Sequence, residues 1–385
     1  MKKRLGLAVG LALCFLLLAC QAGESEKATP TPPITPAPEE TKELEVPSSH
    51  VREAMYYTTQ SGNYVQCQLC PRRCVIPEGQ RGLCEVRENR GGKLYTLVYG
   101  NPVAVHIDPI EKKPFNHFLP ATSALSLATV GCNLDCAYCQ NWTISQARPE
   151  EVASYDLPPE AVVELALEKG CESIAYTYTE PTVFYEYMLD TAKLARAKGI
   201  KNVVITAGFI NPEPLRELCH AVDAIRVDLK GFNQDFYRKV VQGELGPVLE
   251  TLKIIQEEGI HLEIINLVVP TLNDDEEEIR QMCRWILENL GPDVPLHFTR
   301  FYPMYRLKNL PPTPVETLER AREIALEEGL HYVYIGNVPG HPAGNTYCPK
   351  CGKLLIKRMG FYVVENHIVD GKCEYCGEPI PGVWE

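Results

Sequence analysis

Apolar residues in the last two thirds of the chain form short, nearly continuous runs separated by longer amphipathic stretches. A short apolar run bounded by turn residues is typical of a buried strand. Seven such runs predict strands over residues 124–130, 173–178, 202–206, 224–228, 261–269, 296–301 and 331–335.

Between these runs, apolar residues recur at helical spacing and predict helices. The predicted helices cover residues 158–169, 184–198, 213–221, 247–258, 274–289 and 315–328. Pro158 and Pro159 are start signals, and Gly199 and Gly259 follow the last helical residues of two segments. Asp274 lies where a helix N-terminus favours negative charge.

This alternation of strands and helices predicts repeated βα units and a parallel sheet. Six or more such units can curl into a full or partial TIM-like barrel, so the predicted fold class is an α/β, partial or near-complete TIM-like (β/α) barrel. Such barrels carry their chemistry on the loops that follow the strands. We therefore expect functional residues at the carboxyl ends of the predicted strands.

The first fifty residues have a different composition. Basic residues at positions 2–4 precede an apolar run, Leu5–Ala19, which is too short for a comfortable membrane span and predicts a signal segment. Its end, Leu17–Cys20, resembles a bacterial lipobox, which implies lipidation of Cys20. An uncleaved anchor or a misassigned start codon are the alternatives. Residues 21–50 are rich in Pro, Thr and Glu and predict an extended linker.

Charge and cysteine content narrow the function classes. The 385-residue chain has a net charge of -12, which argues against non-specific nucleic-acid binding. Sixteen cysteines are many for this length, and most fall into clusters at metal-ligand spacing. Cys171, Cys219 and Cys283 stand alone in or beside apolar segments, where a buried structural thiol is the default.

Three cysteines follow the first predicted strand of the barrel. Cys132, Cys136 and Cys139 have the spacing C-x3-C-x2-C, with the aromatic Tyr138 before the third. Three thiolates can hold three irons of a [4Fe–4S] cluster and leave the fourth open to a substrate-like ligand. The alternative is a zinc site completed by a distant residue.

Four more cysteines precede the barrel, within residues 51–110. Cys67, Cys70, Cys74 and Cys84 are separated by Gly and Pro residues that favour tight turns, so together they can close one metal site with four cysteine ligands. A structural zinc and a second iron–sulfur cluster are both compatible with four cysteines. Disulfides are a third possibility.

The tail, residues 346–385, contains two C-x2-C pairs. Each pair is followed by glycine, a pattern typical of a zinc ribbon or a rubredoxin-like site. The four cysteines are Cys348, Cys351, Cys373 and Cys376. The spacing favours structural zinc, with a single iron as the alternative. The acidic residues around these pairs do not make a nucleic-acid surface.

Polar residues at the ends of later strands complete the candidate site. Thr179 and Glu180 follow the second strand, and Glu180 can accept hydrogen bonds from an ammonium group or simply begin a helix. Thr206 ends the third strand, where Gly208 permits either close approach of a ligand or an ordinary turn.

Asp228 and Lys230 follow the fourth strand and suit ribose hydroxyls and a carboxylate, or form a surface ion pair. Three further residues, for which packing is the more common role, are His297, Arg300 and Tyr302.

Taken together, these motifs resemble the radical S-adenosylmethionine (SAM) superfamily. The resemblance covers residues 56–385 and is to the pyruvate formate-lyase activating enzyme branch, in particular to the AmmeMemoRadiSam system radical SAM enzymes. It implies a [4Fe–4S] cluster on the three cysteines of residues 131–142 and reductive cleavage of SAM to a 5′-deoxyadenosyl radical. The residues that it implies around SAM are Tyr138, Thr179, Glu180, Asp228 and Lys230. Residues 111–345 would form this radical SAM core.

The chain departs from that branch at three places. Tyr178 and Thr179 replace a glycine pair before Glu180. The activating enzymes have an acid where this chain has Ile205, and an arginine where it has Ile265-Asn266. These departures weigh against glycyl-radical formation as the reaction, but not against SAM cleavage.

The resemblance also implies partners and raises a question of location. It implies an electron donor such as a flavodoxin or ferredoxin, and companions of the Memo and AMMECR1 families. A lipid anchor places the body at a membrane, whereas a low-potential cluster belongs in a reducing compartment. Retention at the cytoplasmic face, or in the cytoplasm, reconciles the two. The alternative function is an iron–sulfur electron carrier or zinc-binding scaffold without SAM chemistry.

Overall fold

The computed structural model describes residues 46–385. The predicted signal, Cys20 and residues 21–45 of the predicted linker lie outside this range. The last linker residues, Ser48–His50, form a short 3-10 helix (η1), and the carbonyl of His50 accepts a hydrogen bond from Tyr99 N at 3.1 Å. The described fold therefore begins just before the predicted boundary. Within residues 46–385, no helix is both long and apolar enough to span a membrane.

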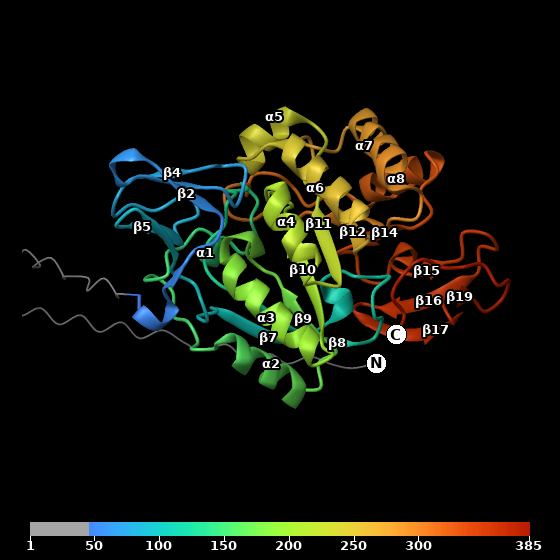
Figure 1. The fold of residues 1–385 in the computed structure, drawn as a ribbon. Helices are drawn as coiled ribbons and strands as arrows, with labels where there is room; N and C mark the ends of the chain where they lie inside the picture. Colours follow the sequence, from blue (N-terminus) through green and yellow to red (C-terminus); the bar gives the residue numbers. More distant parts are fainter. Residues whose placement is uncertain (1–45) are drawn as a thin grey trace, which may run out of the picture. The chain divides into compact units, whose positions relative to one another are not determined.

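An eight-stranded sheet forms the centre of the body, with the strand order β14-β13-β12-β11-β10-β9-β8-β7 (Figure 1). Its seven parallel strands are β8 (Ser123–Ala128), β9 (Ser173–Tyr176), β10 (Lys201–Thr206), β11 (Ala224–Asp228), β12 (His261–Val268), β13 (Leu296–Arg300) and β14 (Val333–Gly336). All seven were predicted from the sequence, whereas the antiparallel edge strand β7 (Ala104–Pro109) was not. Since β7 and β14 are the two ends of the order, the sheet is an open, partial barrel, which confirms the predicted fold class.

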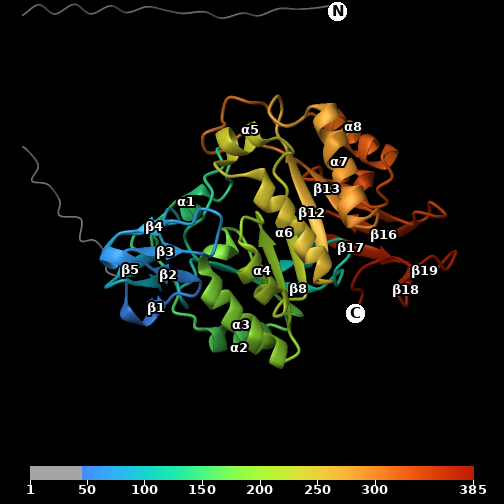
Figure 2. The same cartoon turned by 45° about the horizontal axis from the view of Figure 1, so that its top comes forward.

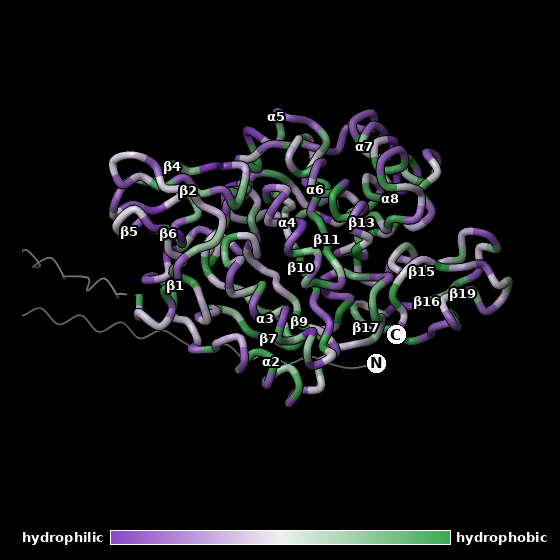
Figure 3. Tube along the Cα trace, in the orientation of Figure 1, coloured by the Kyte–Doolittle hydropathy of each residue, from purple (hydrophilic) through white to green (hydrophobic). Residues whose placement is uncertain are grey.

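Helices follow the strands and cover one face of the sheet (Figures 1 and 2). They are α2 (Pro159–Glu168), α3 (Tyr185–Ala197), α4 (Pro212–Cys219), α6 (Leu245–Glu257), α7 (Glu276–Leu290) and α8 (Val315–Glu327). The tube in Figure 3 is mostly hydrophobic along the central strands and mixed along the helices, as one-sided burial requires. The backbone of α7 begins at Glu276 because the side chain of Asp275 accepts hydrogen bonds from Glu277 N and Glu278 N.

The opposite face of the sheet is filled by the segment that follows β7. Side chains of η3 (Ile110–Lys112), Phe115 and Phe118 pack there in one apolar cluster. The strand residues in this cluster alternate with those that face the helices, as strand geometry dictates. They are Ala124, Ala175, Val203, Ile205 and Ala224. The face of the sheet opposite the helices is the concave, inner face of the partial barrel, and it is therefore a packed core and not a pore.

The C-terminal tail forms short strands and then returns to the sheet. Its strands are β15 (Thr346–Tyr347), β16 (Leu354–Met359), β17 (Tyr362–Asn366), β18 (Ile368–Val369) and β19 (Lys372–Cys373). Beyond them, Val383 exchanges backbone hydrogen bonds with His117 (2.8 Å) and Leu119 (2.7 Å), and the ring of His117 bonds the carbonyl of Pro381. Residues 381–384 thereby close one end of the concave face.

The N-terminal part of the body contains two small antiparallel sheets. Their strands are β1 (Arg52–Glu53), β2 (Tyr57–Thr59), β3 (Val65–Cys67), β4 (Val75–Ile76), β5 (Arg87–Arg90) and β6 (Lys93–Thr96). A buried ion pair fixes them to α3: Arg87 Nη2 lies 2.6 and 2.7 Å from the two carboxylate oxygens of Glu186, which also accepts from Met55 N at 2.7 Å. Only 1% of Arg87 and 2% of Glu186 is exposed.

Gly131, which precedes the first cysteine of the central motif, lies against the N-terminal part. Its φ is +96°, and a Cβ there would come within 2.7 Å of Val86 Cγ1 and 2.9 Å of the carbonyl oxygen of Cys84. We expect Gly131→Ala to lower the free energy of unfolding by about 2–4 kcal/mol, from left-handed strain and overpacking together. Gly170→Ala is the control, since its φ is +63° but no atom lies within 4 Å, and it should lose only about 1 kcal/mol. Equal losses in urea unfolding would contradict this account of Gly131.

Candidate active site

The loop after β8 holds Cys132, Cys136 and Cys139, and it ends in α1 (Trp142–Ser145). Backbone hydrogen bonds fix it on both sides. Ala137 N donates to Val240 O (2.8 Å), in the turn η5 (Tyr237–Val241) that follows β11. The carbonyl of Ala137 accepts from Arg306 N (2.9 Å) and Leu307 N (3.1 Å), in the loop after β13. The loop is therefore preorganised by segments from distant strands.

The three sulfur atoms are partly buried and share one environment. Burial raises the pKa of Cys136 to about 12, although the nearby charge of Lys230 opposes the rise, and burial together with Glu180 raises the pKa of Cys132. Metal binding would lower both of these raised pKa values, because thiolates and not thiols are the ligands. The sulfurs of Cys132, Cys136 and Cys139 do not all lie within 4.8 Å of one another, unlike those of the close cysteine group found elsewhere in residues 46–385. Their wider spacing fits a multi-iron core better than a single ion, so the residues fit a [4Fe–4S] cluster.

Glu180 joins the ends of β9 and β10. Its buried carboxylate accepts hydrogen bonds from Thr182 N (3.1 Å) and Oγ1 (2.7 Å), Thr206 Oγ1 (2.6 Å) and Ala207 N (2.8 Å). Three of these bonds go to Oε1 and one to Oε2, so Oε2 keeps a lone pair for a further donor. The structure thus brings the predicted residues Glu180 and Thr206 together, but it uses both to fix the loops. Whether either touches a ligand stays a prediction.

Tyr178 takes the left-handed conformation that the replaced glycine would favour, with a φ of +65°. Its hydroxyl donates to Asp108, and the Lys113 ammonium lies 4.6 Å from its ring centroid. Its carbonyl accepts from Asn141 Nδ2 at 2.7 Å, while Thr179 Oγ1 donates to Thr129 O at 2.9 Å. The loop after β9 is thereby attached to the cysteine loop at two points, and contacts to Asp108 and Lys113 compensate for the missing glycine.

Asp228 and Lys230 lie beside the cysteine loop, at the end of β11. Lys230 Nζ is 2.7 Å from Asp228 Oδ2, and Arg226 bonds the other oxygen. Burial alone would raise the pKa of Asp228, but the charges of Arg226 and Lys230 outweigh burial and lower it. Burial lowers the pKa of Lys230, but Asp228 and Cys136 raise it further. The structure thus shows the ion pair of the alternative interpretation, with the side chains of Asp228 and Lys230 22% and 16% exposed, and a contact of either residue with a ligand stays a prediction.

Of the other predicted residues, one lies in the cysteine loop and two are hydrogen-bonded to other parts of the protein. Tyr138 is 5% exposed, stacks on Phe236 with ring centroids 6.3 Å apart, and has no hydrogen-bond partner for its hydroxyl among the described residues. His297 bonds Glu263 at 2.7 Å in a buried network, so its role is packing. Arg300 is bound to the carbonyl of Thr313. The three isolated cysteines are buried, as expected: Cys171, Cys219 and Cys283.

Several charged residues of the site were missed from the sequence. Arg226 could have been predicted, because it lies two residues before Asp228 and therefore on the same face of a strand. Asp108 and Lys113 could not have been predicted, since they belong to the unpredicted strand β7 and the segment after it. Arg306, which bonds Asp135 at 2.8 Å, lies in a loop without a recognisable pattern.

The four cysteines of the tail have the geometry of a single-ion site. Their sulfur atoms all lie within 4.8 Å of one another, with 3.6 Å between Cys348 and Cys376 and 3.8 Å between Cys351 and Cys373. Tetrahedral coordination with a metal–sulfur bond of about 2.3 Å places the sulfurs about 3.8 Å apart. The tail can therefore hold one tetrahedral ion, zinc or iron.

We expect Cys348→Ser/Cys376→Ser to lose one metal ion per chain and to lower the midpoint of thermal unfolding, because the free energy of metal binding stabilises the folded tail. Metal analysis of the purified protein and calorimetry measure both. Cys171→Ser/Cys219→Ser is the matched control, with two buried sulfurs removed and no ion lost. An unchanged metal content in the first variant would rule out the site.

Comparison with known proteins assigns the family. The family model described as the radical SAM superfamily matches residues 126–283, from β8 into α7. An uncharacterized protein of Methanocaldococcus jannaschii is 51% identical over 332 residues, which cover 86% of this chain and 99% of the relative. The chain belongs to the radical SAM superfamily. It is thus a radical SAM enzyme, and the family implies that SAM and a [4Fe–4S] cluster are its cofactors.

Relatives with named activities are more distant from this radical SAM protein. The pyruvate formate-lyase-activating enzyme of Clostridium pasteurianum is 26% identical over 163 residues, 42% of this chain and 67% of the relative. Among solved structures, a radical SAM methyltransferase from Sphaerobacter thermophilus aligns with a TM-score of 0.45 and 17% identity, over 62% of this chain and 71% of that one.

Proposed function

We propose that this enzyme cleaves SAM reductively with a [4Fe–4S] cluster on Cys132, Cys136 and Cys139, and that the resulting 5′-deoxyadenosyl radical removes hydrogen from a protein or small-molecule substrate. The supporting observation is the meeting of the cysteine loop, the β9–β10 junction and the β11 charges at one edge of the sheet. The cluster, when bound, supplies the electron that breaks the carbon–sulfur bond of SAM.

The side chains of this edge have separate tasks in the proposal. Three cysteines leave one iron open for the amino and carboxylate groups of SAM. Lys230 stabilises negative charge beside Cys136, and Asp228 accepts hydrogen bonds from the ribose. Glu180, whose Oε2 accepts only one hydrogen bond within residues 46–385, accepts from the SAM ammonium together with the backbone carbonyl of Thr179. Tyr138 excludes water behind the cysteine loop.

The test uses the full chain, reconstituted with iron and sulfide without oxygen and mixed with dithionite and SAM. The expected products are 5′-deoxyadenosine and methionine in equal amounts, measured by mass spectrometry. A spectroscopically intact cluster that gives neither product would overturn the proposal. That outcome would favour the alternative, an electron carrier without SAM chemistry.

Three assignments remain proposals beside it. The low-potential electron would come from a flavodoxin or ferredoxin. Companions of the Memo and AMMECR1 families are proposed from the subfamily resemblance. A lipid anchor at Cys20, outside the described residues, would hold the enzyme at a membrane, on its cytoplasmic side if the cluster is to stay reduced.

A further inference from the structure

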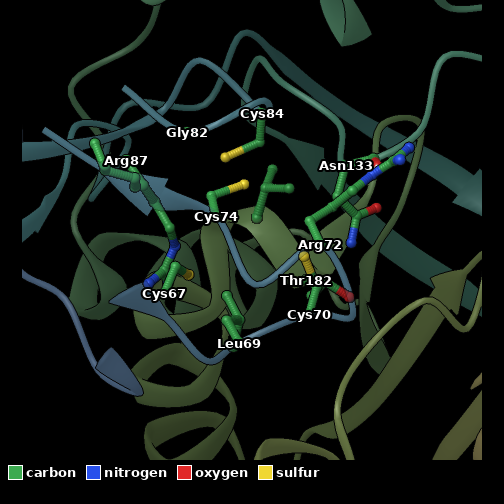
Figure 4. A pocket seen from close by; sticks show the side chains of 12 residues that line it. Cys67, Leu69, Cys70, Arg72, Cys74, Gly82, Cys84, Arg87, Asn133 and Thr182 are labelled. Carbon is green, nitrogen blue, oxygen red and sulfur yellow. The ribbon is translucent and has the colours of Figure 1, made fainter. Parts of the chain in front are cut away.

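The four N-terminal cysteines surround a single cavity in the body (Figure 4). Cys67 ends β3, Cys70 and Cys74 lie in the turn before β4, and Cys84 precedes β5. All four thiols line this cavity and are free. The disulfide alternative is therefore wrong for these residues, and a ligand with four sulfur-binding positions fits.

The spacing of the sulfur atoms separates a single ion from a cluster. The tail cysteines, which suit one ion, approach to 3.6 and 3.8 Å. Within residues 46–385, no group of three or more among the N-terminal cysteines has all its sulfurs within 4.8 Å. A tetrahedral zinc needs about 3.8 Å between sulfurs, whereas the core of a four-iron cluster holds its cysteines further apart. The same contrast separates the tail from Cys132, Cys136 and Cys139.

The wall of the cavity is suited to an anionic group. Arg87 lines it, is 1% exposed, and has a buried Nε without a hydrogen-bond partner in the described part of the chain. Asn133 lines it as well, and its Oδ1 is likewise buried and unpartnered there. The charge of Arg87 is already balanced by Glu186, but its free Nε–H can donate a hydrogen bond to a sulfur of a cluster bound in the cavity.

The cavity adjoins the cysteine loop of the active site on both sides of Cys132. Before it, Gly131 lies so close to the carbonyl of Cys84 that a Cβ would be 2.9 Å away. After it, the carbonyl of Asn133 accepts a hydrogen bond of 2.9 Å from Arg72 Nε, another residue of the cavity wall. A redox group in the cavity would thus be separated from the Cys132 loop by little more than one residue of backbone.

We infer that Cys67, Cys70, Cys74 and Cys84 hold a second [4Fe–4S] cluster, fully ligated by protein, that relays electrons to the active site. One electron leaves a low-potential flavodoxin- or ferredoxin-type donor and one arrives at the active-site cysteines, so no bond or proton changes on the way. The relay rests on the proposed SAM cleavage, but the presence of the cluster does not.

The test measures acid-labile sulfide, iron and zinc in the full chain after anaerobic reconstitution with iron and sulfide. We expect about eight sulfides per chain in the natural protein and about four in Cys132→Ala/Cys136→Ala/Cys139→Ala, with four sulfides marking each [4Fe–4S] core. The triple variant should also give a paramagnetic signal of a reduced cluster with dithionite. Cys139→Ala alone serves if the triple variant is insoluble, and Cys171→Ala/Cys219→Ala is the control with two buried thiols removed and about eight sulfides kept.

The result that overturns the inference is a triple variant with no labile sulfide and an additional zinc. That result is independent of SAM cleavage, which the natural protein would still perform. Conversely, a cluster in the triple variant together with no 5′-deoxyadenosine from the natural protein would overturn only the proposed function.

The relay has its own readout. In Cys70→Ser/Cys84→Ser, dithionite reaches the active site directly, so SAM cleavage with dithionite should stay within about threefold of the natural protein. Cleavage driven by reduced flavodoxin should fall at least tenfold. An equal decrease with both reductants would exclude a relay.

Discussion

Replacing Cys136 with alanine should reduce formation of 5′-deoxyadenosine to the background of cluster-free protein. One of the three cysteine-ligated irons of the cluster loses its ligand, and two thiolates are too few to hold a [4Fe–4S] cluster in the site. The decrease should exceed the roughly 10–100-fold that losing an outer-shell partner costs a metal site. Product is measured by mass spectrometry after anaerobic incubation with dithionite and SAM.

Cys283→Ala is the control, because it also removes one thiol, but from a fully buried position in α7, among residues that face the sheet. It should retain most of the activity. If Cys136→Ala also retained activity, the cluster would have to be held elsewhere, and the assignment of the active site would be wrong.

The second large effect is on stability. Glu186→Ala should lower the free energy of unfolding by about 3–5 kcal/mol, since it leaves the buried guanidinium of Arg87 without its counter-charge. Glu257→Ala is the comparison: its ion pair with Arg216 has the similar length of 2.8 Å, but the side chains are 58% and 44% exposed. That loss should stay below about 1 kcal/mol.

Urea unfolding of both variants, prepared without metal, gives the two free energies. Similar losses would mean that Arg87 finds another partner or reaches water in the variant. The free energy lost in Glu186→Ala measures how much the buried ion pair contributes to fixing the N-terminal sheets to α3.

The barrel could be predicted because its strands are buried on both faces. A strand such as β11 (Ala224–Asp228) can be recognised from its short apolar content between two helical patterns, without knowing its neighbours, and its predicted bounds match. Strand β7 escaped because it pairs only at an edge and contains polar residues such as His106 and Asp108. The closure of the concave face by residues 381–384 depends on contacts between distant segments, which no local pattern encodes.

The candidate site shows the same division. The cysteine motifs were visible because metal ligands must keep a fixed spacing within one loop. The role of Glu180 was not, because its four hydrogen bonds come partly from β10 and its loop, folded next to it. Arg87 and Glu186, 99 residues apart, could be paired only once α3 was placed against the N-terminal sheets.

The return of the tail to His117 has a consequence during protein synthesis. The ring of His117 and the carbonyl of Pro381 are 264 residues apart. At roughly 5–20 residues per second, a ribosome needs about 13–50 s to make that stretch. Throughout this time Phe118 and the ring of His117 lack the contacts that residues 381–384 make with them in the folded protein. Chaperones that bind emerging apolar segments would therefore find their target at the end of the concave face that these residues close, until the last turn of the tail leaves the exit tunnel.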